Sequence, residues 1–397
     1  MKTTILVVGA GVIGLSTAYQ LARDPACRVI VLEKDVCGAG SSSRAAGIIT
    51  GLLWSETGVR ARQKSLALFR ELSHSLPGYR FRDVGCLNLF DDPAWAQRQP
   101  LLPLYDRLAI PYEILDAAEM QRRWPSLQVP PGTTGLYDPL GGYSEPDEYL
   151  PALVAGVRAR EVEIREGVQV TGFAVRDGRL AGVQTAEGEI GADAVVCTVH
   201  AWVLKLIEAI GAHLPIKTFV HQRYVTQPLA VPPSIPAINA NPLGGYVRPS
   251  GAGALLVGVE TPDRAEYRVA SLDFQMTQVA APPGLGDEAI TRFSTLVPAL
   301  AGATCRERRV GLIAFSLDGE PVLGPLPGPT GLYVGAAFHS GGFAYNPVAG
   351  LILSQLVLSG QSEIDVAAFA PGRFVPAEVD AYMGETVAQS QVFKRRH

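Results

Sequence analysis

The chain has 397 residues, of which 47% are hydrophobic and 18% charged, and its formal net charge at pH 7 is −4. This length predicts two domains with a large buried core, and the charge balance excludes the strong basic field that nucleic-acid and anionic-membrane binders present. No stretch spans a bilayer and no N-terminal targeting segment is visible, so we expect a cytoplasmic protein without a membrane span.

Cysteines are scattered along the sequence and form no C-x-x-C pair: Cys27, Cys37, Cys86, Cys197 and Cys305. Their odd number and wide spacing predict reduced thiols rather than disulfides. Protein zinc sites need clustered cysteine and histidine ligands, so we expect no metal.

The N-terminal region has the pattern of a strand–helix–strand unit. Residues 4–8 and 28–32 are apolar runs typical of strands buried on both faces. Between them, residues 15–23 carry a helical pattern that Asp24-Pro25 ends. This order predicts a βαβ unit.

Further along the chain, apolar periodicity predicts additional helices and strands. Helices are expected at 58–76, 146–161 and 347–358, and strands at 81–90, 194–199 and 331–337. On the first of these helices, the solvent-exposed face is expected to carry Arg62, Lys64, Arg70 and Glu71. Residues 216–310 are rich in strand patterns and contain a proline-rich loop at 228–242. They predict a second, mostly antiparallel part of the protein.

A glycine-rich loop follows the first strand and opens the first helix: Gly9-Ala10-Gly11-Val12-Ile13-Gly14. In this G-x-G-x-x-G pattern, the first glycine allows a tight turn, the second lets a pyrophosphate approach the backbone, and the third lets helix and strand pack closely. Free N–H groups at the helix N-terminus attract the phosphates. Glu33 ends the second strand, where a carboxylate accepts hydrogen bonds from ribose hydroxyls, and Lys34 is expected beside it. The loop predicts a dinucleotide site without separating FAD from NAD.

Two other segments favour FAD. Residues 38–49 are a run of small residues suited to close approach by a second part of the ligand, Gly-Ala-Gly-Ser-Ser-Ser-Arg-Ala-Ala-Gly-Ile-Ile. Residues 318–324 read Asp-Gly-Glu-Pro-Val-Leu-Gly and precede the last strand and the pair Gly341-Gly342. A simple nicotinamide enzyme needs neither segment.

With these motifs the chain resembles, nearly end to end, the D-amino-acid oxidase-like FAD-dependent oxidoreductases. This superfamily includes glycine oxidase, monomeric sarcosine oxidase and the catalytic subunits of sarcosine oxidase and proline dehydrogenase complexes; residues 40–72 look most like the complex subunits. The resemblance implies oxidation of the C–N bond of an amino acid or secondary, N-substituted amine by hydride transfer to flavin N5, followed by imine hydrolysis. The partners would be that small substrate and either oxygen or an electron-transfer protein, in a homo- or hetero-oligomer.

The resemblance and the element order together predict an α/β fold. It would comprise a Rossmann-like FAD-binding domain and a second α+β substrate lobe dominated by a mostly antiparallel sheet. We expect the FAD-binding domain to be discontinuous, built from residues 1–80, 146–215 and 311–397. The substrate-binding lobe would then comprise residues 81–145 and 216–310.

Carried over by position, the resemblance also implies which residues hold FAD. The glycine-rich loop and Glu33 would hold the ADP part, and Val170 would pack near adenine. Residues beside the pyrophosphate and flavin would be Ser41, Ser42, Ser43, Arg44, Ala46 and Gly47, and those against the isoalloxazine would be His339, Ser340, Gly341, Gly342 and Phe343. His339 is also the candidate catalytic residue at the flavin, with a turn or core histidine as the alternative. A helix opening near Pro347 could point its dipole toward the flavin N1–O2 edge.

The substrate end departs from the family pattern. Relatives hold the substrate carboxylate with arginine or lysine at positions where this chain has Ile313, Ser340, Thr50 and Ala344. Either another residue grips the carboxylate or the substrate presents none there. Replacement candidates are Tyr246 and Arg248, or Arg223 and Tyr224, with Arg44 as an outside candidate; for the first four, a surface or lobe-packing role is the alternative.

Four further positions bear on the flavin. Gly311 stands where monomeric sarcosine oxidase attaches its flavin to cysteine, so we expect noncovalent FAD. Leu256 stands where that enzyme activates oxygen with lysine, which favours a dehydrogenase. His200 replaces a glycine and could titrate near neutral pH, with a satisfied structural role as the alternative. Asp318, in an Asp-Gly turn, is expected to be structural.

The sequence leaves three functions open. The chain is an FAD-dependent amine or amino-acid oxidase or dehydrogenase, a catalytic subunit that passes electrons to a partner protein, or a flavin-binding protein whose active site has decayed. The full set of cofactor motifs favours the first two, and the missing carboxylate grips motivate the third.

Overall fold

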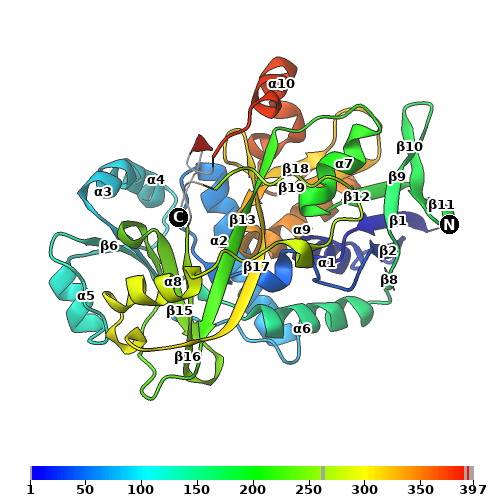
Figure 1. The fold of residues 1–397 in the computed structure, drawn as a ribbon. Coiled ribbons are helices and arrows are strands. Elements are labelled where there is room, and N and C mark those ends of the chain that lie inside the picture. The colour runs from blue at the N-terminus through cyan, green and yellow to red at the C-terminus, as the bar shows by residue number, and fades with distance from the viewer. Residues whose placement is uncertain (1, 261–263, 389–390, 393–397) are drawn as a thin grey trace.

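The computed structural model describes residues 2–260, 264–388 and 391–392 (Figure 1). Within these residues the chain forms a six-stranded sheet, here the first sheet, and a nine-stranded sheet, here the second sheet. In Figure 1 the first sheet lies on the right, beside the N-terminus, and long strands of the second sheet cross the centre. Two sheets with covering helices confirm the predicted mixed α/β fold.

The first sheet contains the predicted βαβ unit. Its strand order is β18-β19-β12-β1-β2-β8, in which β18 runs antiparallel to β19 and the other neighbours pair in parallel. The strands are β1 Thr3–Val8, β2 Cys27–Glu33, β8 Glu163–Glu166, β12 Ala194–Cys197, β18 Val322–Pro325 and β19 Leu332–Ala336. The strands expected at 4–8, 28–32, 194–199 and 331–337 are therefore confirmed, with their ends shifted by one to two residues.

Side chains of β1 alternate between two hydrophobic layers, as a strand buried on both faces requires. Ile5 and Val7 face a layer of helices, whereas Leu6 and Val8 face a small antiparallel sheet and a short helix. The helices are α1 Val12–Leu21, α2 Glu56–Ser75, α6 Pro146–Arg158 and α9 Gly342–Ser359. The opposite layer comprises β9 Val170–Arg176, β10 Arg179–Thr185, β11 Gly188–Gly191 and α7 Val203–Glu208.

The second sheet collects strands from distant parts of the chain in the order β20-β17-β13-β16-β15-β14-β4-β6-β5. Its neighbours pair antiparallel except for β14 and β4, which run parallel. The strands are β4 Cys86–Phe90, β5 Glu113–Leu115, β6 Thr134–Asp138, β13 Ile216–Thr226, β14 Ala237–Ala240, β15 Gly245–Ser250, β16 Ala254–Val259, β17 Cys305–Ser316 and β20 Phe338–His339. Helices α5 Ala117–Arg123 and α8 Leu285–Ser294 contribute to the hydrophobic core on one of its faces.

The remaining elements lie around these layers. Helices α3 Asp92–Arg98 and α4 Leu102–Arg107 follow β4, and α10 Pro376–Gly384 lies near the C-terminus. Short strands β3 Ile48–Ile49 and β7 Gly142–Tyr143 pair antiparallel. The predicted boundary between residues 310 and 311 falls inside β17, and β20 joins the second sheet, so strands of the two predicted domains pair there.

Helix α9 begins earlier than the sequence indicated. We expected its start near Pro347, but Pro347 lies inside a helix that begins at Gly342. Proline lacks the N–H that would bond the carbonyl of Phe343, and the side-chain amide of Asn346 donates to that carbonyl instead. The Asn346 carbonyl oxygen accepts from Ser16 Oγ and Tyr149 Oη, each at 2.6 Å. Asn346 thereby repairs the helix and ties it to α1 and α6.

Among the described residues, α9 is also the one helix whose length and composition would allow it to cross a membrane. About two thirds of it, 67%, is buried inside the protein. Its buried residues belong to the same hydrophobic core as those of α1 and α2, which is the setting of a core helix.

Candidate active site

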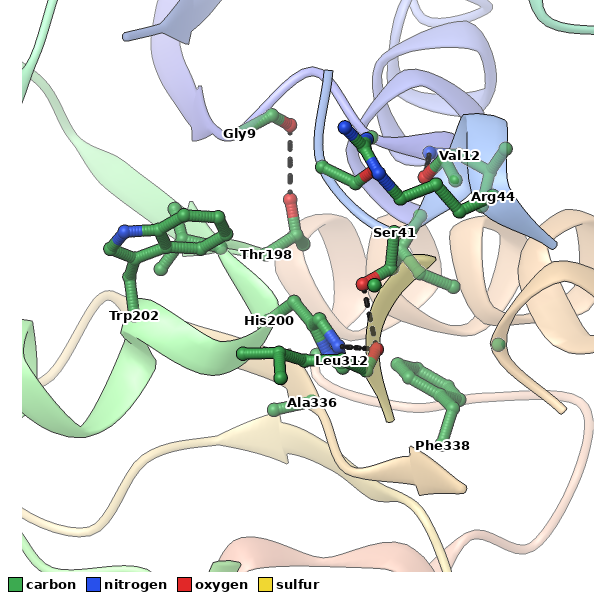
Figure 2. A pocket seen from close by; sticks show the side chains of 18 of the residues that line it. Gly9, Val12, Ser41, Arg44, Thr198, His200, Trp202, Leu312, Ala336 and Phe338 are labelled. Carbon is green, nitrogen blue, oxygen red and sulfur yellow. Dashed lines mark hydrogen bonds between the residues drawn. The ribbon is translucent and has the colours of Figure 1, made fainter. Parts of the chain in front are cut away.

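A pocket lies where the two sheets meet, at the carboxyl ends of the parallel strands of the first sheet. Its walls come from the ends of β1, β2, β12 and β19, from residues 40–46, and from β13, β15, β17 and β20 of the second sheet. Open α/β sheets bind ligands at such strand ends. Figure 2 shows how Gly9, Thr198, Trp202 and Leu312 approach one another from these different elements.

The glycine-rich loop has the geometry expected for a phosphate cradle. Gly9 has φ +98°, and a Cβ there would lie 2.9 Å from the carbonyl oxygen of Thr198. A Cβ on Gly14 would lie 1.9 Å from the Gly9 carbonyl oxygen, which leaves no room for a side chain. Gly11 caps α1, and the N–H of Val12 donates to Ser42 Oγ at 3.0 Å. The N-terminal end of α1 therefore opens into the pocket among small groups, as an anion site requires.

At the end of β2, Glu33 is anchored by backbone groups. Its carboxylate accepts from the N–H of Ala10 at 2.8 Å and from the N–H of Asp35 at 3.0 Å. Burial raises the pKa of Glu33, against the opposing effect of these two hydrogen bonds. Lys34 Nζ lies 5.0 Å from the centre of the Trp202 ring. With Val170, these residues form the end of the pocket where the sequence placed ribose and adenine.

The carbonyl oxygen of Leu312 joins three elements beside the pocket. Ser41 Oγ donates to it at 2.8 Å, and His200 Nε2 lies 2.9 Å from it (Figure 2). Burial lowers the pKa of His200, which keeps the imidazole neutral at neutral pH. His200 thus lines the pocket while making a structural hydrogen bond, the alternative that the sequence left open for it.

Arg44 also lines the pocket, but its guanidinium is engaged by the backbone. Its Nη1 donates to the carbonyls of Ala39 and Gly40. The side chain runs across Gly311, where a Cβ would lie 2.9 Å from Arg44 Cδ. Gly311 therefore provides space for Arg44, which the sequence could not show.

The loop before α9 carries backbone strain at the pocket. His339 has φ +62°, the preceding Ala337 has φ +53°, and His200 across the pocket has φ +50°. Non-glycine residues rarely adopt this region, and such strain concentrates at functional sites. The His339 ring packs edge-on against Phe315 at 4.3 Å between ring centres. Because α9 begins at Gly342, its N-terminus and not the region of Pro347 faces the pocket.

On the second sheet, Tyr246 of β15 and His221 of β13 form a pair that lines the pocket. His221 Nε2 lies 3.0 Å from Tyr246 Oη. Burial raises the pKa of Tyr246, so its hydroxyl stays protonated at neutral pH. His221 was not among the residues selected from the sequence. Side chains along a strand alternate between its two faces, so His221 and Tyr224 lie on opposite faces of β13. This alternation could have indicated that His221 faces the pocket if Tyr224 does not.

The other three candidates on the second sheet, Arg248, Arg223 and Tyr224, are not among the described residues that line the pocket. Both terminal nitrogens of Arg248 bind Glu145, at 2.8 and 2.9 Å, and its Nε donates to the Ala46 carbonyl. Arg223 pairs with Glu307 at 3.0 Å. Tyr224 packs on the opposite face, where a Cβ on Gly286 would lie 2.9 Å from its ring. Of the four candidates on the second sheet, only Tyr246 faces the pocket.

The predicted cofactor residues divide into those that line the pocket and those that support it. The supporting residues include Gly14, whose role is packing, and Gly47, where a Cβ would lie 2.0 Å from the Ser144 carbonyl oxygen. Ser43 presents its carbonyl to Arg309 at 2.6 Å, and Gly341 lines a smaller neighbouring pocket. The residues that line the main pocket are Gly9, Gly11, Val12, Ile13, Glu33, Lys34, Ser41, Ser42, Arg44, Ala46, Val170, His339, Ser340, Gly342 and Phe343.

Residues at the departures from the family pattern have varied settings. Ile313 lines the pocket, whereas Thr50 donates to Asp138 at 2.8 Å in the interior.

Asp318 forms a two-point ion pair with Arg373, at 2.8 and 2.9 Å. Burial would raise the pKa of Asp318, but the hydrogen bonds from Arg373 outweigh it and lower that pKa. Asp318 therefore has the structural role expected from its turn.

Comparison with known proteins agrees with this geometry. Over 392 residues the chain is 28% identical to glycine oxidase from Pseudomonas putida, covering 94% of this chain and 99% of that protein. It is 27% identical to sarcosine oxidase subunit beta from Rhizobium meliloti, covering 93% of this chain and 88% of that protein. The structure of L-proline dehydrogenase from P. horikoshii superposes with a TM-score of 0.84 at 23% identity, covering 97% of this chain and 99% of that one. Residues 4–356 match the family described as FAD dependent oxidoreductase (DAO), and the chain belongs to that family of FAD-dependent enzymes.

Proposed function

We propose that the chain oxidises the C–N bond of an amino acid or a secondary, N-substituted amine, with noncovalently bound FAD. The observation that carries this proposal is the continuity of the pocket. It runs from the glycine-rich loop and Glu33 at one end to His221, Tyr246, Ile313 and His339 of the second sheet. Relatives named glycine oxidase and sarcosine oxidase subunit beta act on substrates of this class.

The residues present fit FAD. The Gly9–Gly14 loop and the start of α1 would hold the pyrophosphate, Glu33 the ribose, and residues 339–343 the isoalloxazine edge. Cysteine is absent from the described lining of the pocket, which supports noncovalent binding. When bound, FAD supplies the two-electron acceptor that C–N oxidation needs.

The His221–Tyr246 pair suits the proton transfer that amine oxidation requires. An amine is protonated at neutral pH, and oxidation of its C–N bond needs the nitrogen lone pair. The Tyr246 hydroxyl can accept the ammonium proton of the substrate while its own proton passes to His221 Nε2 across their 3.0 Å contact, so that Tyr246 stays protonated. A base within hydrogen-bond reach is the geometric requirement. The apolar neighbours Ile313 and Phe338 would exclude water from the same space.

A steady-state assay with Tyr246→Phe tests this proposal. A panel of N-methyl amino acids, secondary amines and D- and L-amino acids is supplied with an artificial electron acceptor, and the carbonyl product is trapped and quantified. We expect a carbonyl product from at least one substrate, with kcat/KM on the order of 100-fold lower in Tyr246→Phe. Tyr333→Phe is the matched control because Tyr333 does not line the described pocket and its hydroxyl donates to the Leu356 carbonyl. Absence of a carbonyl product from every substrate in the panel would overturn the proposal.

A second proposal concerns the electron acceptor: the chain passes electrons to a partner protein rather than to oxygen. Lys34 is the one lysine in the described lining, and it follows Glu33 at the end of the pocket where the ribose would bind. Leu256 is fully buried in β16. The relative named sarcosine oxidase subunit beta is itself a subunit of an assembly. Slow reoxidation of the reduced protein by oxygen would support this proposal, and rapid formation of hydrogen peroxide by the isolated chain would contradict it.

A further inference from the structure

A second, smaller pocket adjoins the main one and shares Phe338 and His339 with it. Trp54, Arg62 and Tyr345 also line it. Its cavity volume of about 20 Å³ gives room for one or two water-sized groups, since a single water needs at least about 10–15 Å³. This pocket could therefore take one end of a ligand but not a whole amino acid.

Arg62, on α2, presents unused hydrogen-bond donors at this small pocket. The side chain is fully buried, with 0% of its surface exposed. Its Nη1 donates to the Thr50 carbonyl at 3.3 Å, and the guanidinium lies over the Tyr345 ring at 4.3 Å. Its Nε and Nη2 have no hydrogen-bond partner among the described residues. Nη2 lies against Gly341, where a Cβ would be 2.7 Å away.

Arg62 differs in this respect from Arg248 and Arg309, two arginines near the main pocket. Arg248 binds Glu145 and Arg309 binds Asp147, each through two nitrogens. By contrast, no described carboxylate lies within ion-pair distance of Arg62. Burial lowers the pKa of Arg62, against weaker opposing effects of Tyr345 and Asp138, and a buried cation that contacts no carboxylate is costly. An anion that entered the pocket would offset this cost.

A second buried donor lies at the same place. The indole Nε1 of Trp54 is buried and has no hydrogen-bond partner in the described part of the chain. Among the described residues, Nε and Nη2 of the Arg62 guanidinium and Nε1 of the Trp54 indole thus have no acceptor with good hydrogen-bond geometry, although the Tyr345 hydroxyl lies close enough to Arg62 to favour its charged form. A carboxylate has two oxygens and several lone pairs, which matches this set of donors.

We propose that Arg62, with Trp54, binds the carboxylate of the substrate, while the amine end of the substrate reaches past His339 into the main pocket. This inference rests on the proposed function, because it assigns one end of that same substrate. It identifies the substrate as an amino acid or N-substituted amino acid rather than an amine without an acid group. Arg62 acts by binding and orienting the substrate, since a guanidinium recognises a carboxylate at two points.

Glu320 offers the competing explanation, because it is buried and lines the same pocket. If its carboxylate neutralises Arg62, no ligand anion is needed there. The variant Glu320→Gln separates the two cases. Under our proposal the wild type already binds the anion, and loss of the nearby negative charge strengthens that binding. Under the competing explanation the wild type binds no anion and only Glu320→Gln does.

Binding of small probes to the FAD-loaded protein tests the inference without relying on turnover. Acetate and its neutral counterpart acetamide are titrated by calorimetry, with the flavin absorption spectrum as a second readout. We expect wild type to bind acetate and not acetamide, and Arg62→Gln to bind acetate on the order of 100-fold more weakly, as loss of one partner of a buried charged pair predicts. Arg62→Lys keeps the charge but loses the two-point geometry, so it should fall between them. Equal acetate affinity in wild type and Arg62→Gln would overturn the inference.

Lys217→Gln is the matched control. Lys217 is also a fully buried cation, but its Nζ donates to Glu266 at 3.0 Å and it lines neither described pocket. The variant should lower stability without changing acetate binding; an equal loss of acetate binding in Lys217→Gln would show that loss of any buried cation has the same effect, and would contradict our assignment.

Kinetics then distinguish this inference from the proposed function. For any amino acid that the wild type oxidises, its primary amide is compared at the same concentration. We expect Arg62→Gln to raise KM for the acid on the order of 100-fold while KM for the amide is unchanged. If wild type oxidises acid and amide equally well, the inference fails and the proposed function stands. If it oxidises no amine at all, the proposed function fails whatever the acetate titration shows.

Discussion

Gly9 and Gly14 show how little space the dinucleotide loop leaves for side chains. Gly9 has a positive φ, and Gly14 lies directly against the Gly9 carbonyl. Their roles could be predicted from the sequence because the spacing of the motif reflects local backbone geometry. Gly311 had no such signal, since its need for a hydrogen side chain comes from Arg44, which lies far away in the sequence.

For Gly14→Ala we expect weaker FAD binding and a free energy of unfolding lower by about 1–3 kcal/mol, the usual cost of overpacking. The new methyl group would meet the Gly9 carbonyl oxygen at 1.9 Å, so the loop must move. Urea unfolding and FAD titration measure both effects. Gly172→Ala is the control, because nothing lies within 4 Å of a Cβ there. Unchanged FAD affinity in Gly14→Ala would argue against the loop as the phosphate site.

The substrate residues were harder to predict than the cofactor residues for a physical reason. Arg248 lies in a motif that looked suited to binding a carboxylate, but Glu145 takes both of its terminal nitrogens from a distant part of the chain. His221 lines the pocket because of which face of β13 it occupies. The helical pattern predicts Arg62 on the exposed face of its helix, which is wrong, because Arg62 is fully buried. Its unpartnered donors become visible only when every neighbour is placed. Such pairings depend on tertiary structure.

At the scale of elements, the Arg248–Glu145 pair joins β15 to the start of α6 and to the Ala46 carbonyl beside the pocket. Burial would raise the pKa of Glu145, but hydrogen bonds from Arg248 outweigh it and lower that pKa below its unfolded value. A carboxyl with a depressed pKa stabilises the fold above its unfolded pKa, and that stability is lost as pH falls through the folded pKa.

Glu145→Gln should therefore cost about 3–5 kcal/mol at pH 7, because Arg248 stays buried without its counter-ion. The difference from wild type should begin to narrow as pH falls below the pKa of an unfolded glutamate, about 4.3, and should narrow further as pH passes through the lower folded pKa of Glu145. Urea midpoints measured from pH 7 to pH 3 follow this. Glu163→Gln removes two exposed ion pairs, with Arg28 and Arg165, and should change stability by less than about 1 kcal/mol. A constant difference between wild type and Glu145→Gln at every pH would exclude the ionic origin of the effect.

Asn346 allows the first turns of α9 to contain a proline while joining three helices. Asn346→Ala would leave the Phe343 carbonyl and the hydroxyls of Ser16 and Tyr149 without their partner. We expect a loss of at least about 1–3 kcal/mol in the free energy of unfolding, together with weaker FAD binding, because Phe343 lines the pocket. Thermal unfolding with and without FAD measures both, with Leu358→Ala at an exposed position of the same helix as control. If both variants behave alike, the Asn346 network has no special role.

The elements of the first sheet could be predicted because buried parallel strands are continuous apolar runs with glycine at their ends. The order of the second sheet could not. Its β4 and β14 pair in parallel although about 150 residues separate Asn88 from its partner Asn239. Nothing local in either strand specifies that neighbour. The early start of α9 was missed for a related reason, since Asn346 compensates for Pro347 only in the folded chain.

For the whole molecule, the pocket joins both sheets, so FAD should stabilise them together. At an FAD concentration 100 times the Kd we expect about 2.7 kcal/mol of added stability by mass action. Thermal unfolding followed by circular dichroism and by release of flavin fluorescence should give one coincident transition. Two separate transitions, with FAD raising only one of them, would show that the ligand contacts a single sheet.

The central claim is that this pocket brings FAD and an amine substrate together for C–N oxidation. The most direct measurement is anaerobic mixing of the FAD-loaded protein with N-methyl amino acids and D- and L-amino acids, followed through the long-wavelength absorption band of the flavin. We predict that at least one amino acid bleaches this band in a single turnover, and that the same amino acid does so much more slowly with Tyr246→Phe. A flavin band that every amine and amino acid leaves unchanged would contradict the account.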